Sequence, residues 1–169
     1  MNLKEFQTHI LPHKNKLYRF AMSIVGNTVE AEDVVQEVFI KIWQNREKVN
    51  SLKSVEAWSM KLTKNLSIDK LRSKHRRTDG LEKTLSISSS DQTPDKAVEM
   101  KDTMSRIKKL MLSLPDKQRL ILQLRDIERM SYDEISKIMD LPLNQVKVNL
   151  FRARKQIRAK LIKSESYGL

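Results

Sequence analysis

Apolar residues recur at helical spacing along most of the chain, and this pattern predicts a series of amphipathic helices. One stripe ends just before Gly26 and consists of Leu17, Phe20, Ala21 and Ile24. The cleanest stripe follows it, at Ala31, Val34, Val35, Val38, Phe39 and Ile42. Residues three or four positions apart share one face of an α-helix, so each stripe predicts a helix with one buried side. Asn27, with Glu30 three residues later, is typical of a capping box at the start of the second helix.

A third helix is predicted from about Val55 to Arg77. The segment before it, residues 44–54, is polar and has no apolar period, so we expect a loop that ends at a capping residue, Ser54. The side chains expected to pack on one side of the helix are Val55, Trp58, Leu62 and Leu66. Its last turns are rich in Lys and Arg, which predicts an end exposed to solvent.

Residues 78–93 interrupt the helical pattern. They contain Gly80 and a run of three serines and have almost no apolar period, which predicts a flexible linker between a domain over residues 1–77 and another over residues 94–169. From Pro94 a new stripe begins, formed by Ala97, Met100, Met104, Ile107 and Met111. It ends at Leu114-Pro115, and a further helix is expected from Asp116 to about Ile127.

The last fifty residues predict a helix-turn-helix. Ser131 and Glu134 have the spacing of a capping box, and the segment Asp140-Leu141-Pro142-Leu143 interrupts the helix that they start. A second, basic helix then begins at Asn144, with a packing stripe of Val146, Leu150, Ala153, Ile157 and Leu161. With only 3 Gly and 4 Pro in the chain there is little material for hairpins, so the predicted fold class is all-α.

The net charge of +12 favours a polyanionic partner. Lys and Arg prevail in both predicted domains, whereas acidic residues prevail in the segment between them. A membrane surface would also attract such a chain, but the turn-separated packing stripes disfavour one long amphipathic face. A basic helix that is merely solvated is the plain alternative, and the capped helix and tight turn before it favour nucleic acid.

Other classes of function have little support. The chain has no Cys and only three His, and no carboxylate cluster completes a metal site, so we expect neither a metal nor a cofactor and no enzymatic activity. The N-terminus has no apolar segment typical of an export signal. A cytoplasmic location is therefore expected.

Two sets of motifs, in order and at matching spacing, resemble one family. The first set is the segment from Ala31 to Phe39 followed by Trp58, Asn65, Asp69 and Arg72. The second is the Leu114-Pro115 step followed by Val146-Lys147 and Arg152-Ala153-Arg154. Together they resemble the extracytoplasmic-function sigma factors of the sigma-70 class, which consist of regions 2 and 4. The likeness extends from about Leu17 to Leu161.

The resemblance implies a dissociable subunit of RNA polymerase that directs core polymerase to promoters and helps to open the duplex. By similarity, the helix from Glu32 to Trp43 would bind the coiled coil of the beta-prime subunit through Asp33, Gln36 and Glu37. The periodicity leaves these residues and Ile40 on the outward face, and an exposed Ile beside carboxylates suits a partner surface. A solvated acidic face is the alternative that the pattern alone would favour.

The resemblance also assigns the loop over residues 45–54 and the helix after it to the minus 10 element, where the separated strand is captured. The residues expected to contact DNA there are Asn50, Lys61, Lys64, Asn65, Lys70, Arg72 and Lys74. A structural role is equally open for some of the motif, because Asp69 and Arg72 can pair and Asn65 can brace the helix. Trp58 is expected in the core rather than as a stacking platform.

Region 4 would place the helix from Asn144 in the major groove at the minus 35 element. On a helical wheel, Gln145, Val148, Asn149 and Arg152 lie away from the packing stripe, where they could meet base edges. Phosphate contacts are expected from Lys147, Arg154 and Lys155. The usual family pattern Gly-Thr-Val-Lys-Ser-Arg is replaced by Asn144-Gln145-Val146-Lys147-Val148-Asn149, so the promoter sequence does not follow from the resemblance.

The partners implied by the resemblance are core polymerase, through the beta-prime coiled coil and the beta flap, promoter DNA, and an anti-sigma factor that can be linked to a membrane. The main competing interpretation is a transcription regulator of another class, whose helix-turn-helix binds an operator while its first half senses a signal or dimerises. That interpretation gives no reason for an acidic amphipathic helix followed by a basic one in the first half.

Overall fold

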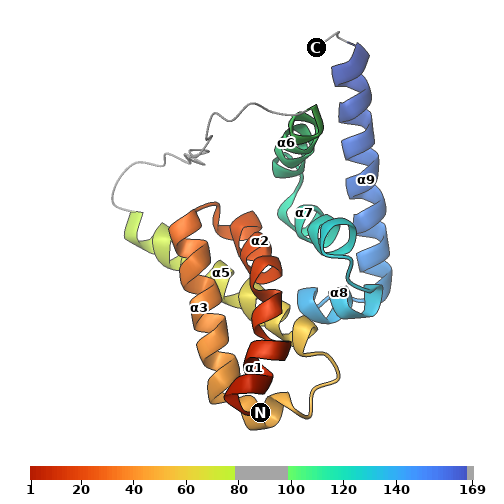
Figure 1. The fold of residues 1–169 in the computed structure, drawn as a ribbon. Coiled ribbons are helices and arrows are strands. Elements are labelled where there is room, and N and C mark those ends of the chain that lie inside the picture. The colour runs from red at the N-terminus through yellow and green to blue at the C-terminus, as the bar shows by residue number, and fades with distance from the viewer. Residues whose placement is uncertain (79–98, 167–169) are drawn as a thin grey trace. The chain divides into compact units, whose positions relative to one another are not determined.

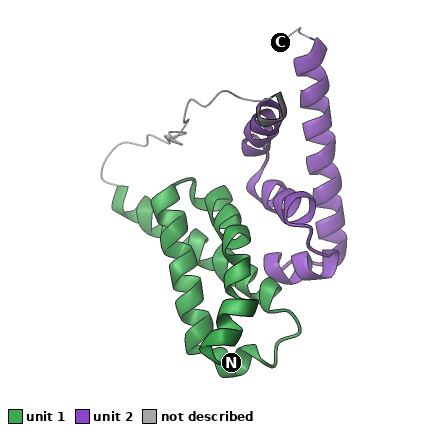
Figure 2. Ribbon diagram, in the orientation of Figure 1, with its two compact units in different colours: residues 1–90 green, residues 91–169 purple. Residues whose placement is uncertain are grey.

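The computed structural model describes residues 1–78 and 99–166, and every regular element within these ranges is helical (Figure 1). The chain divides into two compact units, Met1–Ser90 and Asp91–Leu169, here called unit 1 and unit 2 (Figure 2). This confirms the predicted all-α fold with two helical domains. The predicted linker lies outside the described residues, apart from Thr78, which instead ends a helix.

Unit 1 is built on three long helices that pack against one another: α2 (Lys14–Val25), α3 (Thr28–Gln44) and α5 (Val55–Thr78). Its shorter elements are α1 (Leu3–His9), the 3-10 turn η1 (Leu11–His13) and α4 (Arg46–Val49). The side chains of Leu17, Phe20, Val34, Val38 and Met60 are fully buried and form its core.

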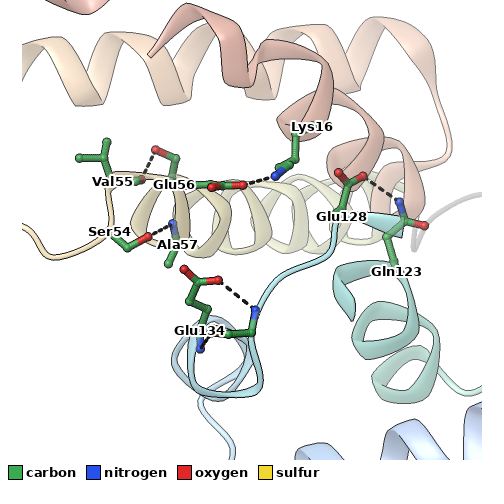
Figure 3. Close-up of polar contacts among 10 residues, drawn as sticks. Lys16, Ser54, Val55, Glu56, Ala57, Gln123, Glu128 and Glu134 are labelled. Carbon is green, nitrogen blue, oxygen red and sulfur yellow. Dashed lines mark hydrogen bonds and ion pairs between the residues drawn. The ribbon is translucent and has the colours of Figure 1, made fainter. Parts of the chain in front are cut away.

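Capping contacts confirm the predicted end of α2 and the predicted starts of α3 and α5. Gly26 ends α2 in the left-handed region with φ 68°, a conformation that costs glycine little. Asn27 then starts α3, and its side-chain oxygen accepts the Glu30 amide at 3.0 Å. At the start of α5, the Ser54 hydroxyl accepts the Ala57 amide at 3.1 Å, and Lys16 of α2 pairs with Glu56 (Figure 3). The ion pair joins α5 to α2.

The segment predicted as a loop contains a helix. Residues 46–49 form α4, and Val49 is buried at 2% exposure. Val49 and Leu52 are the apolar side chains of this polar segment and are too few to show a period, so the sequence pattern could not indicate this turn. A second unpredicted helix, α1, places Phe6 edge-on against Phe39 and Trp43 of α3, with ring centroids 5.9 and 5.7 Å apart.

The packing face of α5 differs from the prediction. Val55, Trp58, Leu62 and Leu66 are only half-buried, whereas the buried positions are Ala57, Ser59, Met60, Thr63, Lys64 and Ser67. Small side chains let α5 approach its neighbours closely, and the Thr63 hydroxyl donates to the Ser59 carbonyl at 2.8 Å, which satisfies the hydroxyl donor within the helix. Trp58 is therefore at the edge of the core.

Unit 2 contains α6 (Glu99–Leu112), α7 (Asp116–Leu122), α8 (Tyr132–Met139) and α9 (Leu143–Ser166). The end of α7 continues into a π-helical turn, η2 (Gln123–Ile127), where the buried Gln123 amide donates to Glu128 at 3.2 Å (Figure 3). The predicted start of α6 at Pro94, and with it Ala97, lies outside the described residues. Both α7 and α8 pack on α9, around Leu124, Ile135, Ile138, Val146 and Leu150.

The predicted helix-turn-helix is present. Ser131 and Glu134 form a reciprocal capping box at 3.0 and 3.1 Å that starts α8 (Figure 3). Asp140 ends it in the left-handed region, and the Pro142 carbonyl accepts the amides of Gln145 and Val146 at the start of α9. Among residues 1–78 and 99–166, no helix is both long and apolar enough to cross a membrane.

Candidate nucleic-acid and partner interfaces

The outward face of α3 carries the residues predicted for partner binding. Asp33, Gln36 and Ile40 are exposed, Ile40 at 55%, and Glu37 is half-buried. The opposite face is buried through Ala31, Val34, Val35, Val38 and Ile42. An apolar side chain thus lies in solvent among carboxylates and an amide, on a helix whose other face fixes it to the core.

Two ion pairs join this face of α3 to α5. The Lys70 ammonium lies 3.7 Å from the Asp33 carboxylate, and the Lys74 ammonium lies 3.7 Å from the Glu30 carboxylate. All four side chains are partly or largely exposed, so each pair contributes about 0–1 kcal/mol. Their significance is spatial, because they place the acidic surface of α3 next to the basic end of α5.

Most of the other residues predicted for the minus 10 element lie at the surface of unit 1. Asn50, Asn65 and Arg72 are exposed, and Lys61 is half-buried. Lys64 is a correction, because it lies within the packing face of α5 at 8% exposure and not on the predicted surface. No ion pair joins Asp69 to Arg72 in the described part of the chain.

The outward face of α9 presents Gln145, Lys147, Val148 and Arg152, all of which are exposed. Asn149 is a second correction. It is buried at 7% exposure, and its side-chain amide donates to the Gln145 carbonyl one turn earlier at 2.7 Å. The buried stripe of α9 is wider than the wheel suggested, and α6, α7 and α8 all contact this helix. Asn149 is therefore not on the exposed face of α9 where it was predicted.

A hollow of about 580 Å³ lies beside this face of α9. It is lined by Tyr132, Lys147, Leu150, Phe151, Arg154, Lys155 and Arg158. The Tyr132 ring is flanked by cations, with the Arg125 guanidinium 4.5 Å and the Lys147 ammonium 5.9 Å from its centroid. Cations around an aromatic wall suit an anionic ligand that also offers apolar surface.

Phe151 was missed by the sequence reasoning. It is 67% exposed and lines the hollow together with four cationic side chains. The available signal was its position, since Phe151 falls outside the packing stripe and inside the basic run. Tyr132 and Arg158 also belong to the hollow, and no local pattern indicated that α8 and α9 bring them together.

Arg154 is held by an acidic residue that the sequence reasoning also missed. Its Nε donates to Asp126 Oδ2 at 3.0 Å and its Nη2 donates to Asp126 Oδ1 at 2.5 Å. The hydrogen bond and charge of Asp126 raise the pKa of Arg154, with a smaller contribution from Tyr132. The pair spans from η2 to α9, so a residue 28 positions away fixes this guanidinium.

The described residues contain no group of three or more His, Asp or Glu side chains that could hold a metal ion. The candidate sites are surfaces rather than catalytic clefts. Their chemistry is recognition: carboxylates with an exposed Ile on α3, and cations with amides and aromatic rings on α5, α8 and α9.

Comparisons with known proteins agree with this division. The family model for sigma-70 region 2 matches residues 10–77, and the model for sigma-70 region 4 matches residues 104–157. The extracytoplasmic-function sigma factor SigW of Bacillus subtilis is 30% identical over 158 residues, which cover 88% of this chain and 84% of that protein. The sigma factor SigV of the same organism is 31% identical, over 94% of this chain and 92% of that protein.

Two solved structures have a similar fold. The sigma factor RpoE of Bartonella quintana, in complex with the anti-sigma factor NepR, has a TM-score of 0.76 at 22% identity and covers 94% of this chain and 98% of that chain. CnrH, in complex with the cytosolic domain of CnrY, has a TM-score of 0.70 at 20% identity and covers 96% of this chain and 90% of that chain.

Proposed function

We propose a division of labour between the two units from the premise that this chain belongs to the extracytoplasmic-function sigma factors of the sigma-70 family. It is a non-enzymatic subunit that directs transcription initiation. In our proposal, unit 1 binds core RNA polymerase and the minus 10 element, and unit 2 binds the minus 35 element.

The polymerase contact in this proposal is the outward face of α3. Asp33, Gln36, Glu37 and Ile40 would meet the coiled coil of the beta-prime subunit. The exposure of Ile40 supports this, because burying it against a helical partner removes apolar surface from water. The surrounding carboxylates and amide add polar contacts that fix the register.

The minus 10 contact in this proposal is the surface of α5 and of the segment before it. Lys61, Lys70, Arg72 and Lys74 would neutralise phosphates, while Asn50 and Asn65 offer amide groups to bases of the separated strand. We leave Lys64 out of this set because it is buried.

The minus 35 contact in this proposal is the start of α9 in the major groove. Gln145, Val148 and Arg152 would face base edges, and Lys147, Arg154 and Lys155 would hold phosphates. We leave Asn149 out because its amide is committed to the Gln145 carbonyl. The capped α8 and the sharp turn at Asp140 support this docking geometry.

Regulation by an anti-sigma factor completes the proposal. One structural neighbour is a complex of a sigma factor with an anti-sigma factor, and the other is CnrH with the cytosolic domain of CnrY. We extend control by an anti-sigma factor to the present chain. We further propose that the chain acts in the cytoplasm, that the inhibitor can be linked to a membrane, and that the beta flap is a second polymerase contact.

The observation that carries the proposal is the pairing, within unit 1, of an acidic face with an exposed Ile on α3 and a basic surface on α5. The test is co-migration of the purified full chain with core RNA polymerase in size-exclusion chromatography. We expect a stable complex that Ile40→Asp disrupts and Val29→Asp does not, since Val29 lies near the start of α3 and is 63% exposed, against 55% for Ile40. Failure of the unaltered chain to co-migrate would favour the operator-binding regulator.

A further inference from the structure

We propose that Asp126 is a positioning residue for DNA binding by unit 2. It orients the Arg154 guanidinium at the wall of the hollow, so that the remaining N–H groups of Arg154 face a backbone phosphate. This inference rests on the proposed function, because it assumes that the surface around α8 and α9 binds duplex DNA.

The geometry leaves Arg154 able to bind a second anion. A guanidinium has five N–H donors in one plane. Asp126 accepts from Nε and from Nη2, which fixes that plane and uses two of the five donors. Tyr132 lies beside the same guanidinium and is itself flanked by Arg125 and Lys147. The donors that remain on Arg154 therefore belong to a surface already built from cations.

The charge of Asp126 is otherwise hard to reconcile with its place. Lys147, Lys155 and Arg158 line the hollow together with Arg154. A carboxylate next to such a site repels a phosphate and should weaken DNA binding by its charge alone. The structure offers a compensating effect, which is the two-point hydrogen bond that removes the rotational freedom of a long side chain before DNA arrives.

A purely structural role accounts poorly for the pair. The two side chains are 45% and 37% exposed, and pairs at that exposure contribute little to folding. The position of α9 is already fixed by Val146, Leu150 and Ala153, which are buried against its neighbours. The remaining effect of Asp126 is to hold the Arg154 side chain in one orientation.

The test compares Asp126→Asn with Asp133→Asn in the full chain. Asp133 is an exposed acidic residue in the first turn of α8, so its variant makes the same charge change without touching Arg154. The probe is a fluorescent 30-base-pair DNA duplex of mixed sequence, titrated by anisotropy at several salt concentrations. We expect Asp126→Asn to weaken binding roughly 2- to 10-fold, as for loss of one preordered side chain. Asp133→Asn should leave binding unchanged or tighten it.

The double variant Asp126→Asn with Arg154→Ala shows whether Asp126 acts through Arg154. We expect it to bind no more weakly than Arg154→Ala alone, and both should reduce the slope of log K against log salt by about one. Additive losses, or tighter binding by Asp126→Asn, would overturn the proposal.

Two controls separate the possible failures. If Asp126→Asn does not fold, Arg154→Lys keeps the charge and removes the two-point pair, and it should weaken binding to the same extent; unchanged affinity would overturn the proposal. If the unaltered chain does not bind duplex DNA at any salt concentration, the proposed function of unit 2 is wrong. If the unaltered chain binds and Asp126→Asn binds more tightly, only the positioning role of Asp126 is wrong.

Discussion

The Lys70 ammonium lies 3.7 Å from the Asp33 carboxylate and so connects α5 to α3 at the surface of unit 1. Asp33 is a proposed polymerase contact and Lys70 a proposed phosphate contact. The two proposed interfaces of unit 1 are therefore adjacent, and a change at one can be separated from a change at the other only by matched variants.

Replacing Asp33 is expected to weaken polymerase binding selectively. Asp33→Ala removes an exposed polar contact, and we expect a loss of roughly 1–2 kcal/mol in competition against the unaltered chain for core polymerase. Glu32→Ala is the control, since Glu32 is an exposed carboxylate one position away that the proposal does not assign to the contact. Equal losses from both variants would mean that only the general acidity of α3 matters.

Arg152 and Asn149 should respond differently to truncation. Arg152 is exposed on the proposed base-reading face, so Arg152→Ala should cost about 1–3 kcal/mol of discrimination at one base pair. Asn149 is buried, and Asn149→Ala should instead lower thermal stability and leave the base preference as it is. The measurement is selection of bound sequences by the polymerase complex. Weakening on all sequences by Arg152→Ala would reassign Arg152 to a phosphate.

Arg129 is expected to destabilise the turn that it occupies. Its φ of 57° lies in the left-handed region, where a residue with a side chain is strained by about 1 kcal/mol relative to glycine. Glycine also gives the unfolded chain more conformational entropy, which offsets part of this gain. Arg129→Gly should therefore raise the free energy of unfolding by about 0.5 kcal/mol. Urea denaturation measures this. Lys137→Gly within α8 is the control and should lower the same quantity by about 1 kcal/mol.

Ser67 should be replaceable without loss of stability. Within the described residues its hydroxyl is fully buried and has no hydrogen-bond partner, which costs about 1–3 kcal/mol. Ser67→Ala removes that group and should raise the free energy of unfolding by about 1 kcal/mol. Thr63→Ala should have the opposite sign, because it removes a satisfied hydroxyl and a buried methyl group. A fall in stability with Ser67→Ala would show that the hydroxyl is solvated in solution.

The helices and their ends could be predicted because their signals are local. Asn27 and Ser131 cap helices by accepting amides three residues later, and Gly26 ends a helix by adopting the left-handed conformation. The stripe on α3 was equally clear because its buried positions are all apolar.

The predictions were wrong where the buried face of a helix includes polar side chains. Met60 shares the buried face of α5 with Thr63 and Ser67, which an apolar period does not detect, so the predicted face was displaced and Lys64 was wrongly counted as a surface residue. Asn149 was misplaced for the same reason, since it is polar but lies on the buried side of α9, which α6, α7 and α8 all contact.

The pair of Asp126 and Arg154 could not be predicted from the sequence, for a different reason. The two residues are 28 positions apart, and only the fold brings the end of η2 against α9. Phe151 could have been noted from its position, but its exposed fraction decides its role, and that depends on how α8 packs.

Transcription by a reconstituted polymerase is the most direct test of the account. Core RNA polymerase would be mixed with the full chain on a library of randomised duplex DNA, and the RNA start sites would be sequenced. We predict RNA from a defined set of sequences sharing two elements, only when both components are present, and its loss with Ile40→Asp. RNA that starts without sequence preference, or no RNA although the chain binds duplex DNA tightly, would contradict it.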